Sequence, residues 1–125
     1  VAARAEKVAR TANYIPELEV VGNQSGDILI VGWGGTYGHL YTATKQLLAE
    51  GANVGFAHFD YINPLPKNTA EVFSKFKKII VCELNSGQFV DYLRAKHPDF
   101  KYEQLNKVQG QPFIVQEIVA AVKAL

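Results

Sequence analysis

The chain has 125 residues, of which 48% are hydrophobic and 20% are charged, and its net charge is +1. This length and composition are typical of one globular domain with a single core. The balanced charge argues against nucleic acids and anionic membranes as partners, and no apolar run approaches the roughly 20 residues that cross a bilayer.

Cys82 is the only cysteine, so the chain can form no internal disulfide and cannot hold an iron–sulfur cluster with its own cysteines alone. This composition favours a reducing, cytoplasmic setting. The sequence begins at Val1, contains no methionine and has a charged N-terminus. We therefore expect a piece of a longer polypeptide, whose function depends partly on other domains.

The first part of the chain is predicted to be a connector. Apolar residues spaced by three and four predict an amphipathic helix over 1–15, which Pro16 ends. A short extended stretch over 18–22 and a turn-rich segment follow. We expect residues 1–26 to form a connector helix and linker from an upstream domain, and residues 27–125 to form the domain itself.

From residue 27 onward, predicted strands and helices alternate. A continuous apolar run predicts a strand covered on both faces, and the last strand, which is more polar, is expected at an edge. Predicted strands cover 28–31, 53–59, 78–83 and 101–106. Predicted helices cover 37–50, a short segment after Asn68, 86–96 and 114–125. Gly51 is expected to end the first of these helices, and Asn68 with Glu71 to cap the second.

This alternation predicts right-handed crossovers between strands of a mostly parallel sheet. The predicted fold class is α/β, a three-layer Rossmann-like sandwich.

A glycine loop, GWGGTYG, separates the first of these strands from its helix. Gly32, Gly34 and Gly38 have the spacing G-x-G-x-x-x-G, and Asp60 ends the next strand, as expected of a dinucleotide site. However, Tyr37 stands where the fingerprint has a third glycine. In addition, Asp60 is followed directly by YINPLP, a stiff turn that belongs to no dinucleotide-binding pattern. Alternatively, the glycines let the helix lie close to the sheet without a ligand. The residues alone leave both interpretations open.

Other reactive residues give weaker indications. The three histidines do not have the spacing of metal ligands, and His58 is expected to be a core histidine. Cys82 lies in an apolar strand, which favours a buried, inert thiol over a nucleophile. Glu83 ends that strand, and we expect its carboxylate to accept hydrogen bonds from the start of the next helix rather than to act chemically.

Polar and aromatic residues follow the carboxyl end of each predicted strand. In an open α/β sheet the loops at these ends share one rim, which is where ligands or partners bind. The rim is therefore the predicted functional region, whatever occupies it.

Four motifs, VGWGGTYG, HFDYINPLP, VCELNSGQFVDYLRA and LNKVQGQPF, together resemble the C-terminal domain of the alpha subunit of 2-oxoacid:ferredoxin oxidoreductases, most of all the 2-oxoglutarate type (2-oxoglutarate synthase). The preceding RAEKVARTANYIP resembles the connector of that family. The resemblance implies a transketolase C-terminal-like fold. It also implies a parent enzyme that oxidatively decarboxylates a 2-oxoacid to an acyl-CoA and reduces ferredoxin.

The resemblance places thiamine diphosphate, magnesium and the iron–sulfur clusters elsewhere in the parent enzyme. It carries no catalytic, cofactor-binding or metal-binding residue onto this chain, which we expect to be inactive alone. Its implied partners are the other domains of the alpha subunit and a beta subunit, with ferredoxin and CoA serving the whole enzyme.

We expect the rim to contact these neighbouring domains, because aromatic residues are enriched at interfaces. The residues expected at this interface are Trp33, Thr36, Tyr37, Tyr61, Asn63, Glu83, Asn85, Lys107 and Phe113. The alternative is an independent dinucleotide-binding domain that uses Gly32, Gly34, Gly38 and Asp60.

Overall fold

The computed structural model of the chain describes residues 17–33, 37–59, 65–83, 88–106 and 115–125. The strands are β1 (Val20–Gly22), β2 (Gly26–Trp33), β3 (Val54–Phe59), β4 (Phe76–Glu83) and β5 (Tyr102–Asn106). The helices are α2 (Tyr37–Ala49), α3 (Thr69–Ser74), α4 (Gln88–Lys96) and α5 (Val115–Lys123). The elements predicted from residue 18 onward are confirmed with small shifts of their ends, whereas the predicted helix over 1–15 lies outside the described residues.

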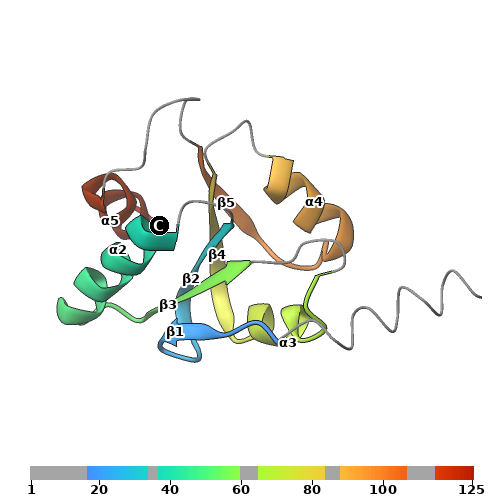
Figure 1. Cartoon of the computed structure of the whole chain (residues 1–125), viewed down its shortest axis with the longest axis horizontal. Helices are drawn as coiled ribbons and strands as arrows, with labels where there is room; N and C mark the ends of the chain where they lie inside the picture. Colours follow the sequence, from blue (N-terminus) through green and yellow to red (C-terminus); the bar gives the residue numbers. More distant parts are fainter. Residues whose placement is uncertain (1–16, 34–36, 60–64, 84–87, 107–114) are drawn as a thin grey trace, which may run out of the picture.

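The five strands form one sheet in the order β1-β3-β2-β4-β5 (Figure 1). β2 runs parallel to β3 and β4, and β4 runs parallel to β5, which is an edge strand as predicted. β1 pairs antiparallel with β3, with Val20 opposite Ala57. The short strand β1, within the segment predicted to be a linker, is thus part of the sheet. The domain boundary at residue 26 stays a prediction.

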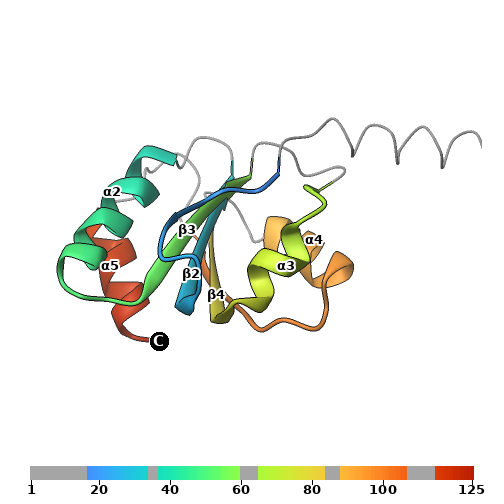
Figure 2. The ribbon, with the colours of Figure 1, turned by 90° about the horizontal axis from the view of Figure 1, so that it is seen from below.

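Helices cover the sheet on both sides, so the predicted three-layer α/β architecture is confirmed. α2 and α5 lie side by side on one face, and α3 and α4 lie on the other (Figures 1 and 2). None of the described helices is long and apolar enough to cross a membrane.

The alternation of side chains along β2 builds two cores. Ile28 and Ile30 pack with α2 and α5, whereas Leu29 and Val31 pack with α3 and α4. A strand that is buried on both faces needs apolar residues at consecutive positions, which explains the continuous run ILIV. The same alternation decides to which side each residue at the end of the strand points.

Gly51 ends α2 as predicted. Its φ of +86° lies in the left-handed region that favours glycine. The amide of Gly51 donates to the carbonyl of Leu48 at 3.0 Å, and the amide of Ala52 donates to that of Leu47 at 3.0 Å. This pair of bonds is a Schellman motif, which satisfies carbonyls at the end of the helix.

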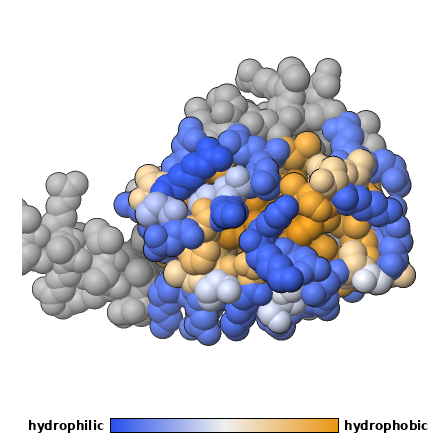
Figure 3. Space-filling model, turned by 180° about the vertical axis from the view of Figure 1, so that it is seen from behind, coloured by the Kyte–Doolittle hydropathy of each residue, from blue (hydrophilic) through white to orange (hydrophobic). Residues whose placement is uncertain are grey.

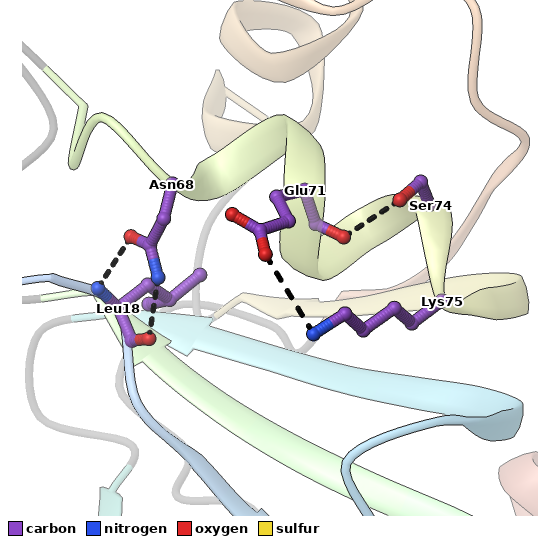
Figure 4. A network of polar contacts seen from close by, with 5 residues as sticks. All are labelled: Leu18, Asn68, Glu71, Ser74 and Lys75. Atoms are coloured by element: carbon purple, nitrogen blue, oxygen red, sulfur yellow. Dashed lines mark hydrogen bonds and ion pairs between the residues drawn. The ribbon is translucent and has the colours of Figure 1, made fainter.

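Asn68 stands at the N-cap position of α3 as predicted, but its side chain is used differently (Figure 4). Its side chain makes no capping hydrogen bond, and instead its Oδ1 accepts from the backbone amide of Leu18 at 2.7 Å and its Nδ2 donates to the carbonyl of Leu18 at 2.9 Å. Glu71, the expected second half of the cap, forms an ion pair with Lys75 instead, with 3.9 Å between its Oε1 and the Lys75 Nζ. A side-chain amide has both a donor and an acceptor, so Asn68 binds the chain just before β1 as a neighbouring strand would.

Candidate functional site

The carboxyl ends of β2, β3 and β4 meet at one rim of the sheet. The chain leaves β2 toward α2 on one face and leaves β4 toward α4 on the other, so a topological switch point lies between these neighbouring strands. At the rim, Gly32 is level with His58 of β3 and with Cys82 of β4. Ligands and partners of open α/β sheets bind at such a place, so the predicted functional region coincides with this rim.

Glu83 holds the start of α4. Its side chain is only 3% exposed, its Oε1 accepts from the amide of Phe89 at 2.7 Å, and its Oε2 accepts from the amide of Val90 at 3.0 Å. The carboxylate thus satisfies two amides at the positive end of the helix, where a negative charge is stabilising. The geometry agrees with the structural role predicted for Glu83 rather than with a chemical one.

Trp33 also faces α4. It lies partly buried against the core on that side, with its ring 5.7 Å from that of Phe89. Phe89 in turn packs edge-to-face on Phe59 at 5.2 Å. Much of the Trp33 ring is therefore used within the domain, which leaves less of it for a partner.

Tyr37 and Tyr41 occupy the α2 side of the rim. Their rings stack at 5.8 Å, and they are 46% and 36% exposed. The Tyr37 ring packs on Phe56 at 5.5 Å and edge-to-face on His58 at 5.2 Å. His58 is therefore partly buried at the rim rather than deep in the core, and its contact with Tyr37 links α2 to β3.

Cys82 is completely buried, and burial raises the pKa of its thiol to about 12, with a further contribution from the charge of Glu83. At neutral pH it is therefore a protonated, inaccessible thiol and a poor nucleophile or metal ligand. Among the residues that the structure describes, no three histidine, cysteine or carboxylate side chains are grouped as a metal site would require.

The glycine loop is only partly described. A Cβ added to Gly38 would meet no described atom within 4 Å, so close packing of helix on sheet does not explain this glycine, contrary to one of the two interpretations of the loop. Gly32 lies buried at the end of β2. Gly34 and Asp60, the other residues of the alternative dinucleotide site, lie outside the described residues.

Of the nine residues expected at the interface, the structure describes Trp33, Tyr37 and Glu83. Only Tyr37 is strongly exposed. Those outside the described residues are Thr36, Tyr61, Asn63, Asn85, Lys107 and Phe113. Tyr41 and Lys45, which were not among the residues expected at the interface, lie four and eight residues after Tyr37 and share one side of α2 with it.

The described residues also line two open cavities. The first, of about 560 Å³, lies between the chain around β1 and α3, where Glu17, Glu19, Glu71 and Lys75 line it. The second, of about 410 Å³, lies near the C-terminal end of α2, where Glu50 and Lys123 form an ion pair at 2.6 Å. Neither contains a residue that the sequence predicted to be functional.

Comparison with known proteins identifies the relatives of the domain. Residues 26–118 match the family described as pyruvate:ferredoxin oxidoreductase core domain II. The chain is 35% identical, over 113 residues, to 2-oxoglutarate oxidoreductase subunit KorA of Mycobacterium tuberculosis. The aligned segment covers 89% of this chain but only 17% of KorA.

Solved structures agree. A 2-oxoglutarate:ferredoxin oxidoreductase from Magnetococcus marinus, with 2-oxoglutarate, coenzyme A and succinyl-CoA bound, superimposes with a TM-score of 0.83 and 29% identity, over 99% of this chain and 23% of that one. A split-gene transketolase, an inactive beta4 tetramer, shares the fold with a TM-score of 0.65 at 16% identity, over 85% of this chain and 40% of that one.

These matches confirm the transketolase C-terminal-like fold and do not favour an independent dinucleotide-binding domain. The matched segment runs from the start of β2 into α5 and contains the whole described rim. The chain therefore belongs to the pyruvate:ferredoxin oxidoreductase core domain II family.

Proposed function

We propose that this chain is the C-terminal structural domain of the alpha subunit of a 2-oxoacid:ferredoxin oxidoreductase that acts on 2-oxoglutarate. The observation that carries the proposal is the match to the enzyme from Magnetococcus marinus over 99% of the chain. The likeness to a 2-oxoglutarate oxidoreductase subunit from a different organism supports the same substrate. The parent enzyme would decarboxylate 2-oxoglutarate oxidatively, form succinyl-CoA and pass electrons to ferredoxin.

In this proposal thiamine diphosphate, magnesium and the iron–sulfur clusters are bound by other parts of the parent enzyme. Support comes from the chemistry of the residues here. A cluster is ordinarily held by several cysteine thiolates, whereas the one cysteine of this chain is buried with its pKa raised to about 12. The rim carboxylate Glu83 is already bound to two backbone amides.

The role of the domain would be to support assembly with the remainder of the alpha subunit and with a beta subunit, in the cytoplasm. The described surface has features suited to such contacts. Apolar areas show between polar side chains in the middle of the face seen from behind (Figure 3), and the pair Tyr37–Tyr41 lies exposed on α2. Exposed apolar area of this kind is typical of surfaces that contact other protein.

The test is an assay of the parent enzyme, expressed from its whole gene together with its partner subunit. We expect reduction of ferredoxin that requires both 2-oxoglutarate and CoA, and bound thiamine diphosphate in the purified protein. The 125-residue chain alone should show neither. A parent protein that reduces ferredoxin with pyruvate but not with 2-oxoglutarate would refute the substrate, and one that decarboxylates no 2-oxoacid would refute the function.

A further inference from the structure

Two of the three large hydrophobic residues that are exposed in the described part of the chain are neighbours on α2. Tyr37 and Tyr41 are 46% and 36% exposed, and their rings stack at 5.8 Å. The buried residues of the same helix are Leu40, Ala43, Thr44 and Leu47, so neither tyrosine is among them. A stacked aromatic pair facing water is typical of a surface that another protein covers.

The Tyr37 ring is held in place by the sheet beneath it. It contacts Phe56 at 5.5 Å and His58 at 5.2 Å, and Phe56 is completely buried. A ring that is already fixed loses little entropy when a partner covers it, which is why rigid aromatic residues anchor interfaces.

The charge beside these rings is positive. The Nζ atom of Lys45 lies 5.6 Å from the centre of the Tyr41 ring. Between Tyr37 and Ala49 the helix contains no acidic residue, and Lys45 is its only side chain with a permanent charge. Tyr37, Tyr41 and Lys45 thus form a positively charged aromatic surface, which is complementary to an apolar surface that carries carboxylates.

We propose that this aromatic surface of α2 docks onto an apolar, carboxylate-bearing face contributed by the remainder of the parent oxidoreductase. The inference rests on the proposed function. The chain spans 17% and 20% of two curated relatives, so most of the protein that could cover the surface lies in their other parts. A second copy of this chain fits less well, because a symmetric contact through this surface would place the two Lys45 charges close together.

The chain contains a matched control on the opposite face of the sheet. Tyr92 and Lys96 of α4 have the same spacing as Tyr41 and Lys45, and the Lys96 Nζ lies 5.7 Å from the Tyr92 ring centre. Tyr92 is half-buried and packs against the core that lies between the sheet and helices α3 and α4. In the domain by itself it should therefore react more slowly with a solvent-borne reagent than either tyrosine of α2.

Hydroxyl-radical labelling of the assembled parent enzyme, followed by mass spectrometry, tests the proposal. In the assembled enzyme we expect the order of reactivity to be the reverse of that in the isolated domain, with Tyr37 and Tyr41 both labelled less than Tyr92. Any order in which either α2 tyrosine is labelled as strongly as Tyr92 overturns the proposal. The labelling does not depend on turnover, so an uncovered surface on an active enzyme would refute the docking surface without refuting the proposed function.

A carbodiimide cross-link from Lys45 tests the chemistry and identity of the partner. We expect a cross-link to an aspartate or glutamate outside this domain, and its loss in the variant Lys45→Gln. A cross-link to a second copy of this chain, or none beyond the domain, overturns the proposed partner. In addition, Tyr37→Ser/Tyr41→Ser should restore labelling of neighbouring residues on α2, whereas Tyr92→Ser should not.

Discussion

The carboxylate of Glu83 accepts a 2.7 Å hydrogen bond from the backbone amide of Phe89, six residues further along the chain. Its other oxygen accepts from Val90 at 3.0 Å, so one buried side chain joins the end of β4 to the start of α4. The same helix start carries Phe89, which packs against Trp33. Loss of Glu83 should therefore disturb the α4 side of the rim as a whole.

Replacing Glu83 with Ala should lower the free energy of unfolding by about 2–3 kcal/mol, because two buried amides lose a charged acceptor. Glu83→Gln should cost about 1–2 kcal/mol, since the amide retains one acceptor but turns its NH₂ group toward the other backbone donor. Urea denaturation followed by circular dichroism measures both.

Asp91→Asn is the control for Glu83, because Asp91 meets Arg94 at 3.5 Å on the exposed side of the same helix. Asp91→Asn should lower the free energy of unfolding by no more than about 0.5 kcal/mol. Equal costs for Glu83→Ala and Asp91→Asn would contradict the capping role.

Asn68→Ala should loosen the chain before β1 rather than α3. The variant loses the two bonds to Leu18 at 2.7 and 2.9 Å, and we expect a cost of about 1–2 kcal/mol. Hydrogen exchange should show faster exchange at the Leu18 amide and through β1, with α3 little changed. Ser74→Ala removes only an exposed bond to the carbonyl of Glu71 and should be nearly neutral. Faster exchange confined to the first amides of α3 would instead restore the capping role that the sequence suggested.

Two glycines should respond in opposite ways to alanine. In Gly55→Ala the new Cβ would lie 2.5 Å from the carbonyl oxygen of Asn23 and 2.8 Å from the Phe76 ring, so strands β1 and β3 would have to separate. We expect a loss of about 3 kcal/mol or more, as for other overpacked core sites. In Gly38→Ala the Cβ meets no described atom, and helix propensity should stabilise the protein by about 0.5–1 kcal/mol. Thermal unfolding of the two variants compares them directly, and a destabilised Gly38→Ala would show that this glycine is needed where it stands.

His97 should make the protein less stable in mild acid. Burial lowers the pKa of its ring, which packs near Phe73 and Phe100, so the unfolded chain binds a proton at a higher pH than the folded one. The contribution of the neutral His97 ring to the free energy of unfolding is fully present above the pKa that His97 has in the unfolded chain, near 6.5. It is lost as the pH falls through the lower pKa that His97 has in the folded protein. Denaturation at pH 7.5 and pH 5 should show a smaller difference for His97→Gln than for the unmodified chain, and an unchanged difference would exclude His97 as the cause.

The thiol of Cys82 should react only when the protein opens. It is completely buried and its pKa is raised to about 12, so thiolate and access are both lacking in the native state. With an aromatic disulfide reagent at pH 8, we expect the native protein to react at least about 100-fold more slowly than the urea-unfolded chain. Comparable rates would show a reactive thiol at the rim.

Much of the fold followed from local patterns in the sequence. The apolar run ILIV identified β2 as a strand covered on both faces, and the spacing of Leu40, Ala43 and Leu47 identified α2. The bonds of Gly51 confirmed the predicted end of that helix. These features depend on neighbours in sequence, so a single chain displays them.

The partner of Asn68 was not predictable in this way. Asparagine before a helix, followed by glutamate three residues later, has the pattern of a cap, but Asn68 binds Leu18, which lies 50 residues earlier. The partner of such a side chain depends on which distant segment the fold brings beside it. Local patterns in one sequence do not show which distant segments come into contact.

The sequence by itself determined the order of the elements, the mostly parallel sheet and the rim at the carboxyl ends of its strands, because these follow from hydrophobic periodicity and from the geometry of crossovers. Only the tertiary structure decided how the rim residues are used. Trp33 and Glu83 lie against α4 and serve the interior, whereas Tyr37 lies over His58 with much of its ring in water. The physical reason is the alternation of side chains along β2 and β4, together with the positions of the helices that cover each face.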